Sequence, residues 1–206
     1  MPLFADLPLT GPLLAALVLY AFVSSVTPGP NNLMLLASGV NFGFRRTLPH
    51  MLGIGAGFTV MTALVGFGLA GAFTAWPPAR SLLTLASVAY LVWLAWKIAA
   101  AAPPAASDRA RGRPLTLLQA AAFQWVNPKA WSMALTAATL YAPRADWPSV
   151  LMVAGVFGAV NLPCVSLWAA AGSALGTWLS EPRRLRAFNI AMALLLLLTL
   201  WPVLAG

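Results

Sequence analysis

The sequence predicts an all-α membrane protein with six transmembrane helices, arranged as two inverted three-helix repeats in which helices 1 and 4 are broken by proline. Three observations predict this fold. The 206 residues are 61% apolar and only 8% charged, whereas soluble domains carry roughly a quarter charged residues. Long apolar stretches recur along the chain, and a proline interrupts the first stretch of each half. The basic residues behind the net charge of +8 gather in alternate connections, as they do in cytoplasmic loops.

Six stretches are long enough to cross a membrane, since a helix needs roughly 20 apolar residues to span a bilayer core of about 30 Å. They are Leu9 to Gly39 (interrupted at Pro28), Thr47 to Phe73, Arg80 to Ala101, Leu115 to Tyr141 (interrupted at Pro128), Trp147 to Leu175, and Leu185 to Leu204. Their continuous apolarity disfavours a β-barrel, in which apolar and polar residues alternate. Each interrupted stretch also fits a helix followed by a re-entrant half-helix, and a five-span topology is a further alternative.

The charge of the connections predicts the orientation. The first, third and fifth connections contain Arg45, Arg46, Lys97, Arg109, Arg111, Arg113, Arg183, Arg184 and Arg186, whereas the opposite side contains only Arg80 and Arg144. Positive connections face the cytoplasm, so both termini are expected outside. The start of the chain has no basic segment before its apolar run, which predicts that it is not a cleavable signal peptide.

The chain is expected to form a single domain over residues 1–206. Repeat 1 covers about 9–101, a cytoplasmic linker rich in Pro, Ala and Arg covers 102–114, and repeat 2 covers about 115–204. Because three is an odd number, the second repeat enters the membrane from the opposite face. Transporters with such inverted repeats bind their substrate where the repeats meet, near the middle of the membrane.

The first break predicts exposed backbone groups inside the membrane. Pro28 and Pro30 lack amide donors and clash with carbonyls four residues earlier, and residues that precede a proline are pushed toward extended conformations. Freed backbone groups cannot face lipid and must line a polar cavity or find protein partners. The restarting helix offers amides to a carboxylate, while the bared carbonyls suit an ammonium; the bland alternative is a simple kink. The candidate substrate-binding residues here are Thr27, Pro28, Gly29, Pro30, Asn31 and Asn32.

The second break places a lysine near the centre of its span, in the sequence Asn127-Pro128-Lys129. Either membrane surface is roughly 20 Å away, beyond the reach of a lysine, and a centred lysine costs about 2.5–3.5 kcal/mol. No acid lies within the expected spans. We therefore expect Lys129 to be neutral, held by carbonyls at a helix C-terminus, or paired with a substrate carboxylate; alternatively, the break lets it reach cytoplasmic water.

Two further polar residues leave alternatives open. Asn161, within the fifth span, fits either a cavity lining or an interhelical hydrogen bond. His50, at the start of the second span, fits an interface histidine, with a proton relay as the lesser alternative. The small-residue spacings Gly53/Gly57 and Gly172/Gly176 are expected to serve helix packing.

Several classes of function are excluded by composition. One His, one Cys and four scattered acids are too few for a metal site, and no cofactor is expected. An intramembrane enzyme would need a nucleophile with a base, or paired acids, and the spans lack both, so we expect no enzyme. The basic charge is assigned to loops next to the lipid bilayer, with no nucleic-acid partner. The sequence leaves the oligomeric state, including a homo-oligomer, open.

Three motifs resemble the LysE/RhtB family of amino-acid exporters: TPGPNN at Thr27–Asn32, GFRR at Gly43–Arg46 and NPKAW at Asn127–Trp131. The segment AYLVWLAWKIA at Ala89–Ala99 is similar to the branch that exports cysteine and O-acetylserine. The resemblance implies a six-helix carrier in the bacterial cytoplasmic (inner) membrane, driven by the proton gradient. Exporters of basic amino acids tend to carry an acid in the second span. Here that span reads LGIGAGFTV (Leu52 to Val60), so neutral substrates fit better.

The sequence thus predicts a secondary transporter that exports small neutral amino acids or derivatives, of the cysteine/O-acetylserine or threonine/homoserine type. Its site would lie between the two broken spans and work by alternating access, with Lys129 and His50 as candidates for proton coupling. The alternatives are a membrane assembly protein without transport activity and a passive channel.

Overall fold

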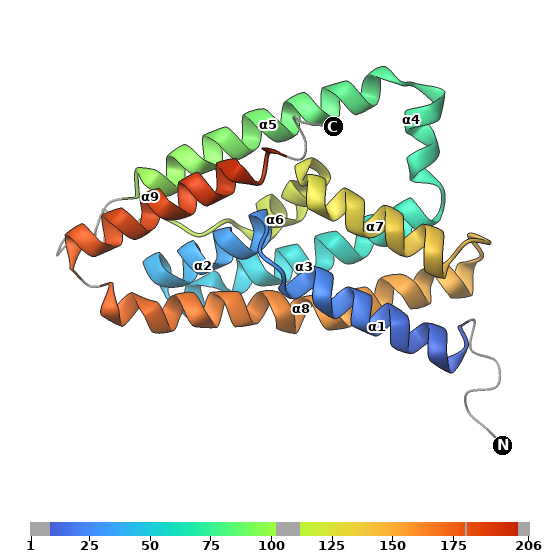
Figure 1. The fold of residues 1–206 in the computed structure, drawn as a ribbon, viewed down its shortest axis with the longest axis horizontal. Helices are drawn as coiled ribbons and strands as arrows, with labels where there is room; N and C mark the ends of the chain where they lie inside the picture. The colour runs from blue at the N-terminus through green and yellow to red at the C-terminus, as the bar shows by residue number, and fades with distance from the viewer. Residues whose placement is uncertain (1–8, 102–111, 180, 202–206) are drawn as a thin grey trace.

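A computed structural model describes residues 9–101, 112–179 and 181–201, and these residues form helices and connections without a strand (Figure 1). The predicted flexible linker falls largely on 102–111, and the two ends of the chain on 1–8 and 202–206, all outside the described residues. The helices are α1 (Gly11–Val26), α2 (Pro30–Phe42), α3 (Phe44–Gly66), η1 (Leu69–Gly71), α4 (Ala72–Ala75), α5 (Pro78–Ala99), α6 (Leu117–Phe123), η3 (Gln124–Val126), α7 (Pro128–Tyr141), α8 (Trp147–Trp178) and α9 (Pro182–Leu198).

Helix starts follow from local sequence. Proline occupies one of the first two positions of α2, α5, α7 and α9, where its missing amide costs no hydrogen bond. Thr116 and Gln119 form a reciprocal capping box at the start of α6, and the Asp146 carboxylate accepts from the Ser149 amide at the start of α8. These caps satisfy amides that would otherwise lack partners in the first turn.

The second span is shorter than expected. The sequence predicts a span from Thr47 to Phe73, but α3 ends at Gly66. Gly68 then adopts a left-handed conformation with φ of 98°, which residues with a side chain rarely adopt. The chain consequently turns into the short helices η1 and α4 instead of continuing α3.

Three of the described helices, α3, α5 and α8, are long and apolar enough to cross a membrane, and the bent pair α1–α2 makes a fourth candidate. Helix α9 has 17 residues, and the α6–α7 segment is broken at Asn127, so neither satisfies the same length condition as one straight helix. The all-helical fold is confirmed, whereas six crossings remain a prediction.

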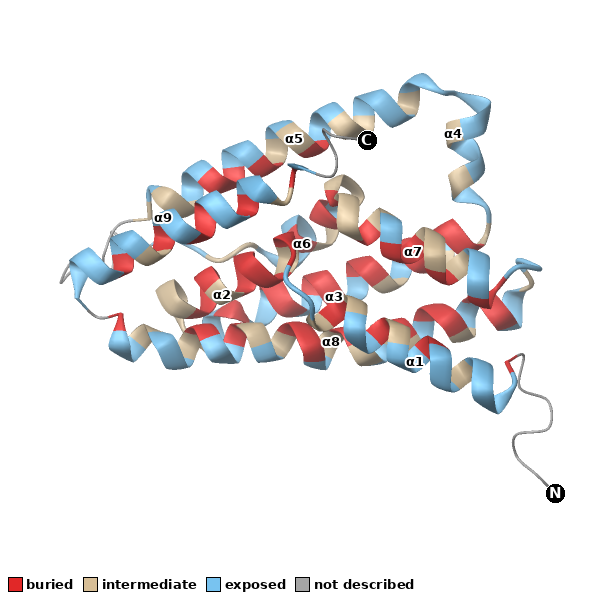
Figure 2. Ribbon diagram, viewed as in Figure 1, coloured by how far each residue is buried: buried red, intermediate tan, exposed pale blue. Residues whose placement is uncertain are grey.

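Helices α3 and α8 connect most of the other helices of the bundle. They contact each other, and between them they also contact α1, α2, α6 and α7, while α5 packs mainly against α9 (Figure 1). Phe58 of α3 and Phe157 of α8 are buried in the core with ring centroids 5.2 Å apart. The outward faces of α1, α5 and α9 are exposed (Figure 2) and carry large apolar side chains such as Leu19, Leu85 and Leu194, as expected for lipid-facing helices.

The glycine pairs pack helices closely, as the sequence predicts. A Cβ on Gly172 would collide with the carbonyl of Leu36, and one on Gly176 would approach the carbonyl of Val40, so α8 lies backbone to backbone against α2. Gly53 and Gly57 bring α3 equally close to Leu117 and Ala121 of α6. These approaches hold both broken segments against α3 and α8.

Candidate functional site at the two helix breaks

The first break is an extended stretch of three residues between α1 and α2. Helix α1 ends at Val26, α2 begins at Pro30, and the two axes are bent by 54°. Thr27 and Gly29 have extended backbones, as expected for residues that precede a proline. The structure therefore shows a real interruption of the helix.

Polar side chains satisfy most carbonyls that the break frees. The Asn32 amide donates to the carbonyl oxygens of Ser25 at 2.9 Å and Thr27 at 2.8 Å. The Trp168 indole, from α8, donates to the carbonyl of Val26 at 3.1 Å, and the Thr27 hydroxyl donates back to the carbonyl of Ser24. The end of α1 thus has protein partners, which a break within an apolar environment requires.

The second break has the same design with a different cap. The short turn η3 ends at Val126, and Asn127 accepts from the Lys129 amide at 3.2 Å before α7 begins at Pro128. Matching the two halves by sequence sets Pro28 against Pro128, but Pro30 is the proline that opens the restarting helix in the first half. Pro30 and Pro128 thus each begin a helix, and Pro28 lies two residues earlier, inside the longer first break.

Lys129 joins the two breaks. Its Nζ donates to the carbonyl oxygen of Thr27 at 2.6 Å, to the Thr27 hydroxyl at 3.0 Å and to the carbonyl oxygen of Pro28 at 3.3 Å. An ammonium has three donor hydrogens, so these three acceptors occupy them all. Of the environments considered for Lys129, the structure has the one in which carbonyls at a helix C-terminus hold the ammonium.

Gly29 makes room for this lysine. A Cβ at position 29 would lie 2.6 Å from Cδ and 3.1 Å from Nζ of Lys129. At the shorter of these distances the lysine side chain would have to move. The glycine between the two prolines therefore permits the lysine to lie across the break.

A second polar link lies beside the lysine. Asn31 of α2 and Gln124 of η3 exchange hydrogen bonds at 2.9 and 3.2 Å, and Gln124 is fully buried. Gln124 is not singled out by the sequence analysis, although a glutamine three residues before Asn127 in an apolar span was an available signal. The breaks are thus connected by one ammonium and one amide pair.

Asn161 lies against the end of α1. Its Nδ2 donates to the Ser25 hydroxyl at 3.1 Å, so the interhelical hydrogen bond is the interpretation that the structure supports. Its buried Oδ1 has no partner among the described residues. The Asn161 side chain therefore has an unused acceptor oxygen and lies against Ser25, near the end of α1.

The site is open on one side. Thr27 and Pro28 are exposed, Lys129 is half-buried, and Asn32 and Asn127 are buried. Gly29 brings no capping side chain to the start of α2, so the first amides of α2 keep their donor capacity. The arrangement offers carbonyl acceptors, one ammonium and helix-terminal amides around a single surface.

His50 lies apart from the breaks. It is only 2% exposed, within α3, and neither ring nitrogen has a hydrogen-bond partner in the described part of the chain. Its ring is therefore buried within the bundle, and both the interface position and the proton relay stay predictions. The structure brings the other candidate residues together and leaves His50 in a separate pocket.

Comparisons with known proteins agree on one family. The chain matches the LysE type translocator family over residues 22–199. It is 34% identical to proteins named cysteine/O-acetylserine efflux protein from Escherichia coli strain K12 and from Shigella sonnei, in each case over 91% of this chain and 95% of the relative. The corresponding protein of Escherichia coli O139:H28 is 34% identical over 92% of this chain and 96% of its own length. No solved structure matches the chain. The chain belongs to the LysE type translocator family.

Proposed function

We propose that the protein is a secondary transporter that exports small neutral amino acids or their derivatives across the cytoplasmic membrane by alternating access. Three relatives carry a name that refers to the efflux of cysteine and O-acetylserine, and this substrate class suits a site with no acidic side chain. The observation that carries the proposal is the contact of the Lys129 ammonium with the carbonyls of Thr27 and Pro28.

The substrate replaces an internal contact. The carboxylate of a zwitterionic amino acid accepts from Lys129 and from the uncapped amides at the start of α2, where a helix N-terminus favours an anion. The substrate ammonium then donates to the carbonyls of Thr27 and Pro28 that the lysine releases. The unused Oδ1 of Asn161 supplies a further acceptor nearby. Substrate binding therefore replaces the three hydrogen bonds of the Lys129 ammonium with bonds from the protein to both charged groups of the substrate.

Two inverted repeats of three spans account for the helix contacts. In this scheme α1 and α2 correspond to α6 and α7, α3 corresponds to α8, and α5 to α9. Helix α3 contacts α6 and α7, and its counterpart α8 contacts α1 and α2 in the same way. The pairs α3–α8 and α5–α9 each consist of two corresponding helices, so exchange of the two repeats leaves both pairs unchanged. This correspondence supports repeats at about 9–101 and 115–204 within a single domain, related by an axis that passes between the breaks.

The charge distribution supports a cytoplasmic position for the basic end. The ends of α2, α5 and α8 and the start of α9 lie at the same end of the molecule (Figure 1). These ends carry or adjoin Arg46, Lys97 and Arg184. Positive residues are retained on the cytoplasmic side, which leaves both termini outside.

Proton coupling has few carriers available. The acids within the described residues, Asp146 and Glu181, precede α8 and α9 and lie outside their helices. Lys129, His50 and the substrate's own groups are the remaining candidates. We propose that export is driven by the proton gradient through one of them.

Counterflow in proteoliposomes tests the function. Vesicles loaded with unlabelled O-acetyl-L-serine are diluted into trace labelled substrate, with and without an imposed pH gradient, and a panel of neutral and basic amino acids is compared. The proposal expects transient accumulation for small neutral substrates and none for lysine or arginine. A saturable signal distinguishes a carrier from a passive channel, which shows no counterflow. No uptake of any panel member would instead favour an assembly protein.

A further inference from the structure

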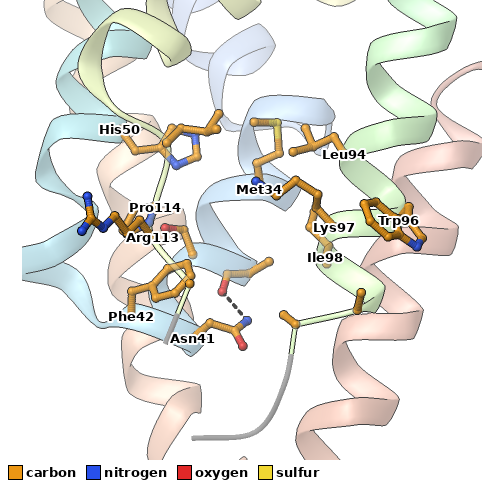
Figure 3. A pocket seen from close by; sticks show the side chains of 16 residues that line it. Met34, Asn41, Phe42, His50, Leu94, Trp96, Lys97, Ile98, Arg113 and Pro114 are labelled. Carbon is orange, nitrogen blue, oxygen red and sulfur yellow. Dashed lines mark hydrogen bonds between the residues drawn. The ribbon is translucent and has the colours of Figure 1, made fainter. Parts of the chain in front are cut away.

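A pocket at the basic end of the bundle is separate from the helix breaks. Its volume is about 390 Å³, and it lies between α2, α3, α5 and the segment before α6 (Figure 3). This volume is within the range of roughly 300–1,000 Å³ that small-molecule sites occupy. Met34, Leu94 and Ile98 provide an apolar wall, and Lys97 and Arg113 provide two cations.

His50 provides the wall with unused hydrogen-bonding capacity. It lines the pocket, is 2% exposed, and has no partner for Nδ1 or Nε2 among the described residues. The neighbouring polar residues differ, because Ser38 bonds to Thr47 and Asn41 bonds to Asn189. A neutral imidazole has one donor and one acceptor, and a buried group without a partner is destabilised. Both nitrogens are buried, so an occupant with polar groups would bond to one of them once the ring turns toward the cavity.

The charges of the pocket select an anionic group. Lys97 and Arg113 are exposed, and neither Asp146 nor Glu181, the acids within the described residues, lines the pocket. A carboxylate is therefore attracted to this end and can bind the Lys97 ammonium, while the Arg113 guanidinium, which points away from the cavity (Figure 3), adds its positive charge. The pocket thus fits a small molecule with a carboxylate, a second polar group and an apolar part that contacts Met34, Leu94 and Ile98.

One face of α2 lines the pocket and continues along the helix toward the first break. Met34, Ala37, Ser38 and Asn41 line it from α2, and residues spaced by three or four lie on one face of a helix. Asn31 continues that face by one further step, about 4.5 Å from Met34 along the axis at 1.5 Å per residue. The Asn31–Gln124 amide pair therefore lies about one turn of α2 closer to the first break than Met34.

We infer that this pocket is a loading site, where a small amino acid binds before it reaches the break. Its carboxylate binds Lys97 close to the charge of Arg113, and His50 turns to bond to its ammonium or side-chain polar group. The inference rests on the proposed export function for its substrate class, and it assigns a second binding position that the helix breaks do not include. Passage to the break requires the Asn31–Gln124 pair to open.

Nitrogen NMR of His50 tests the loading site directly, because the chain has a single histidine. Tag-free protein with ¹⁵N-labelled histidine, in lipid nanodiscs, is titrated at pH 6.5 with O-acetyl-L-serine, and in parallel with propionate and with propylamine. We expect saturable shifts of the ring-nitrogen signals with O-acetyl-L-serine, and half-saturation at about tenfold higher concentration with propionate. Absence of any shift at concentrations that saturate counterflow would overturn the loading site.

Variants at the mouth of the pocket locate the ligand. Arg113→Gln should raise the half-saturating concentration about fivefold, since it removes one exposed charge near the carboxylate. Ala100→Trp, at an exposed lining position, should abolish the shift, whereas Arg144→Gln in the α7–α8 connection should leave it unchanged. A shift that persists in Ala100→Trp would place the ligand elsewhere and contradict the inference.

The two proposals fail separately. The titration uses no gradient and no transport, so saturable His50 shifts in protein without counterflow would overturn export while supporting a ligand site in the pocket. Normal counterflow with an unresponsive His50 would overturn the loading site and leave the break as the only proposed binding position.

Discussion

The Lys129 side chain reaches from one broken segment to the other, and it fits there because Gly29 has no side chain. A Cβ added at position 29 would come within 2.6 Å of Lys129 Cδ. Glycine is needed there because of the space that the lysine occupies, since the extended backbone of Gly29, with φ of −177°, is open to any residue. Gly29 thus provides the space in which Lys129 bonds to the carbonyls of Thr27 and Pro28.

Gly29→Ala is expected to displace Lys129 from the Thr27 and Pro28 carbonyls. Overpacking of this kind typically costs about 1–3 kcal/mol, so we expect counterflow to fall about tenfold while the amount of protein in the membrane stays within twofold. Gly11→Ala is the matched control, because a Cβ there meets nothing within 4 Å. Equal activity of the two variants would show that the lysine does not need its observed position.

The residues of the site differ in how far the sequence predicts them. A proline or a lysine within an apolar span is energetically unfavourable in a membrane helix. Pro28, Pro128 and Lys129 can therefore be recognised from the sequence alone. That Lys129 meets Thr27 depends on the packing of segments about a hundred positions apart, which local rules do not specify. The sequence analysis did not identify Gln124, Ser25 or Trp168. An amide, a hydroxyl or an indole is much less unfavourable than a charge inside a membrane span, so these residues do not stand out.

Among the elements, the broken helices are shaped by proline and fixed by close packing against α8. Helix α1 stops where Pro28 removes the amide that would have bonded to the Ser24 carbonyl, which accepts from the Thr27 hydroxyl instead. The helix limits were predicted well wherever a proline or a cap set them. The end of α3 was not, because the apolar run continues past Gly66 and only the left-handed turn at Gly68 ends the helix.

Pro28→Ala tests whether the break serves transport. The new amide can bond to the Ser24 carbonyl and extend α1, which turns the carbonyls of Thr27 and position 28 away from Lys129. We expect counterflow to drop about tenfold, with membrane levels, measured by immunoblot, near those of the wild type. Pro148→Ala, at the start of α8, is the control. Loss of the Pro28→Ala protein from the membrane would instead make the break a structural requirement.

Gly172→Val tests the close approach of α8 to α2. A side chain at position 172 would collide with the Leu36 carbonyl, and overpacking should destabilise the fold by about 1–3 kcal/mol. The expected result is a lower midpoint of thermal unfolding in detergent. Gly155→Val on the same helix, where a Cβ meets nothing within 4 Å, should change the midpoint much less. Similar losses in both variants would argue against the packing role.

For the whole molecule, basic residues gather at one end (Figure 1) and large apolar side chains are exposed around the bundle, and these two features predict how it lies in a membrane. Arg184 at the basic end pairs with Glu181 at 2.9 Å, an exposed contact of little energetic weight, so its side chain is replaceable. Charge asymmetry predicts an orientation from the sequence alone, since it needs only a count of basic residues on alternate connections, and that orientation stays a prediction. The packing of the other helices against α3 and α8 could not be predicted from such a count, because it depends on which small residues face each other.

Cysteine labelling in intact cells tests the orientation. In a Cys164→Ala background, a membrane-impermeant maleimide should label Arg144→Cys and leave Arg184→Cys unlabelled until the cells are opened, because positive connections stay in the cytoplasm. Labelling of Arg184→Cys in intact cells would reverse the assigned orientation.

The most direct measurement is chemical rescue of a positive charge at position 129. Lys129→Cys, in the Cys164→Ala background, is assayed by counterflow before and after reaction with 2-aminoethyl methanethiosulfonate, which restores an ammonium, or with methyl methanethiosulfonate, which adds a neutral group. If the ammonium at the two breaks holds the substrate, the unmodified variant is inactive and only the cationic reagent restores counterflow, at least tenfold above the neutral one. Wild-type counterflow without modification, or equal rescue by both reagents, would contradict a role for the charge.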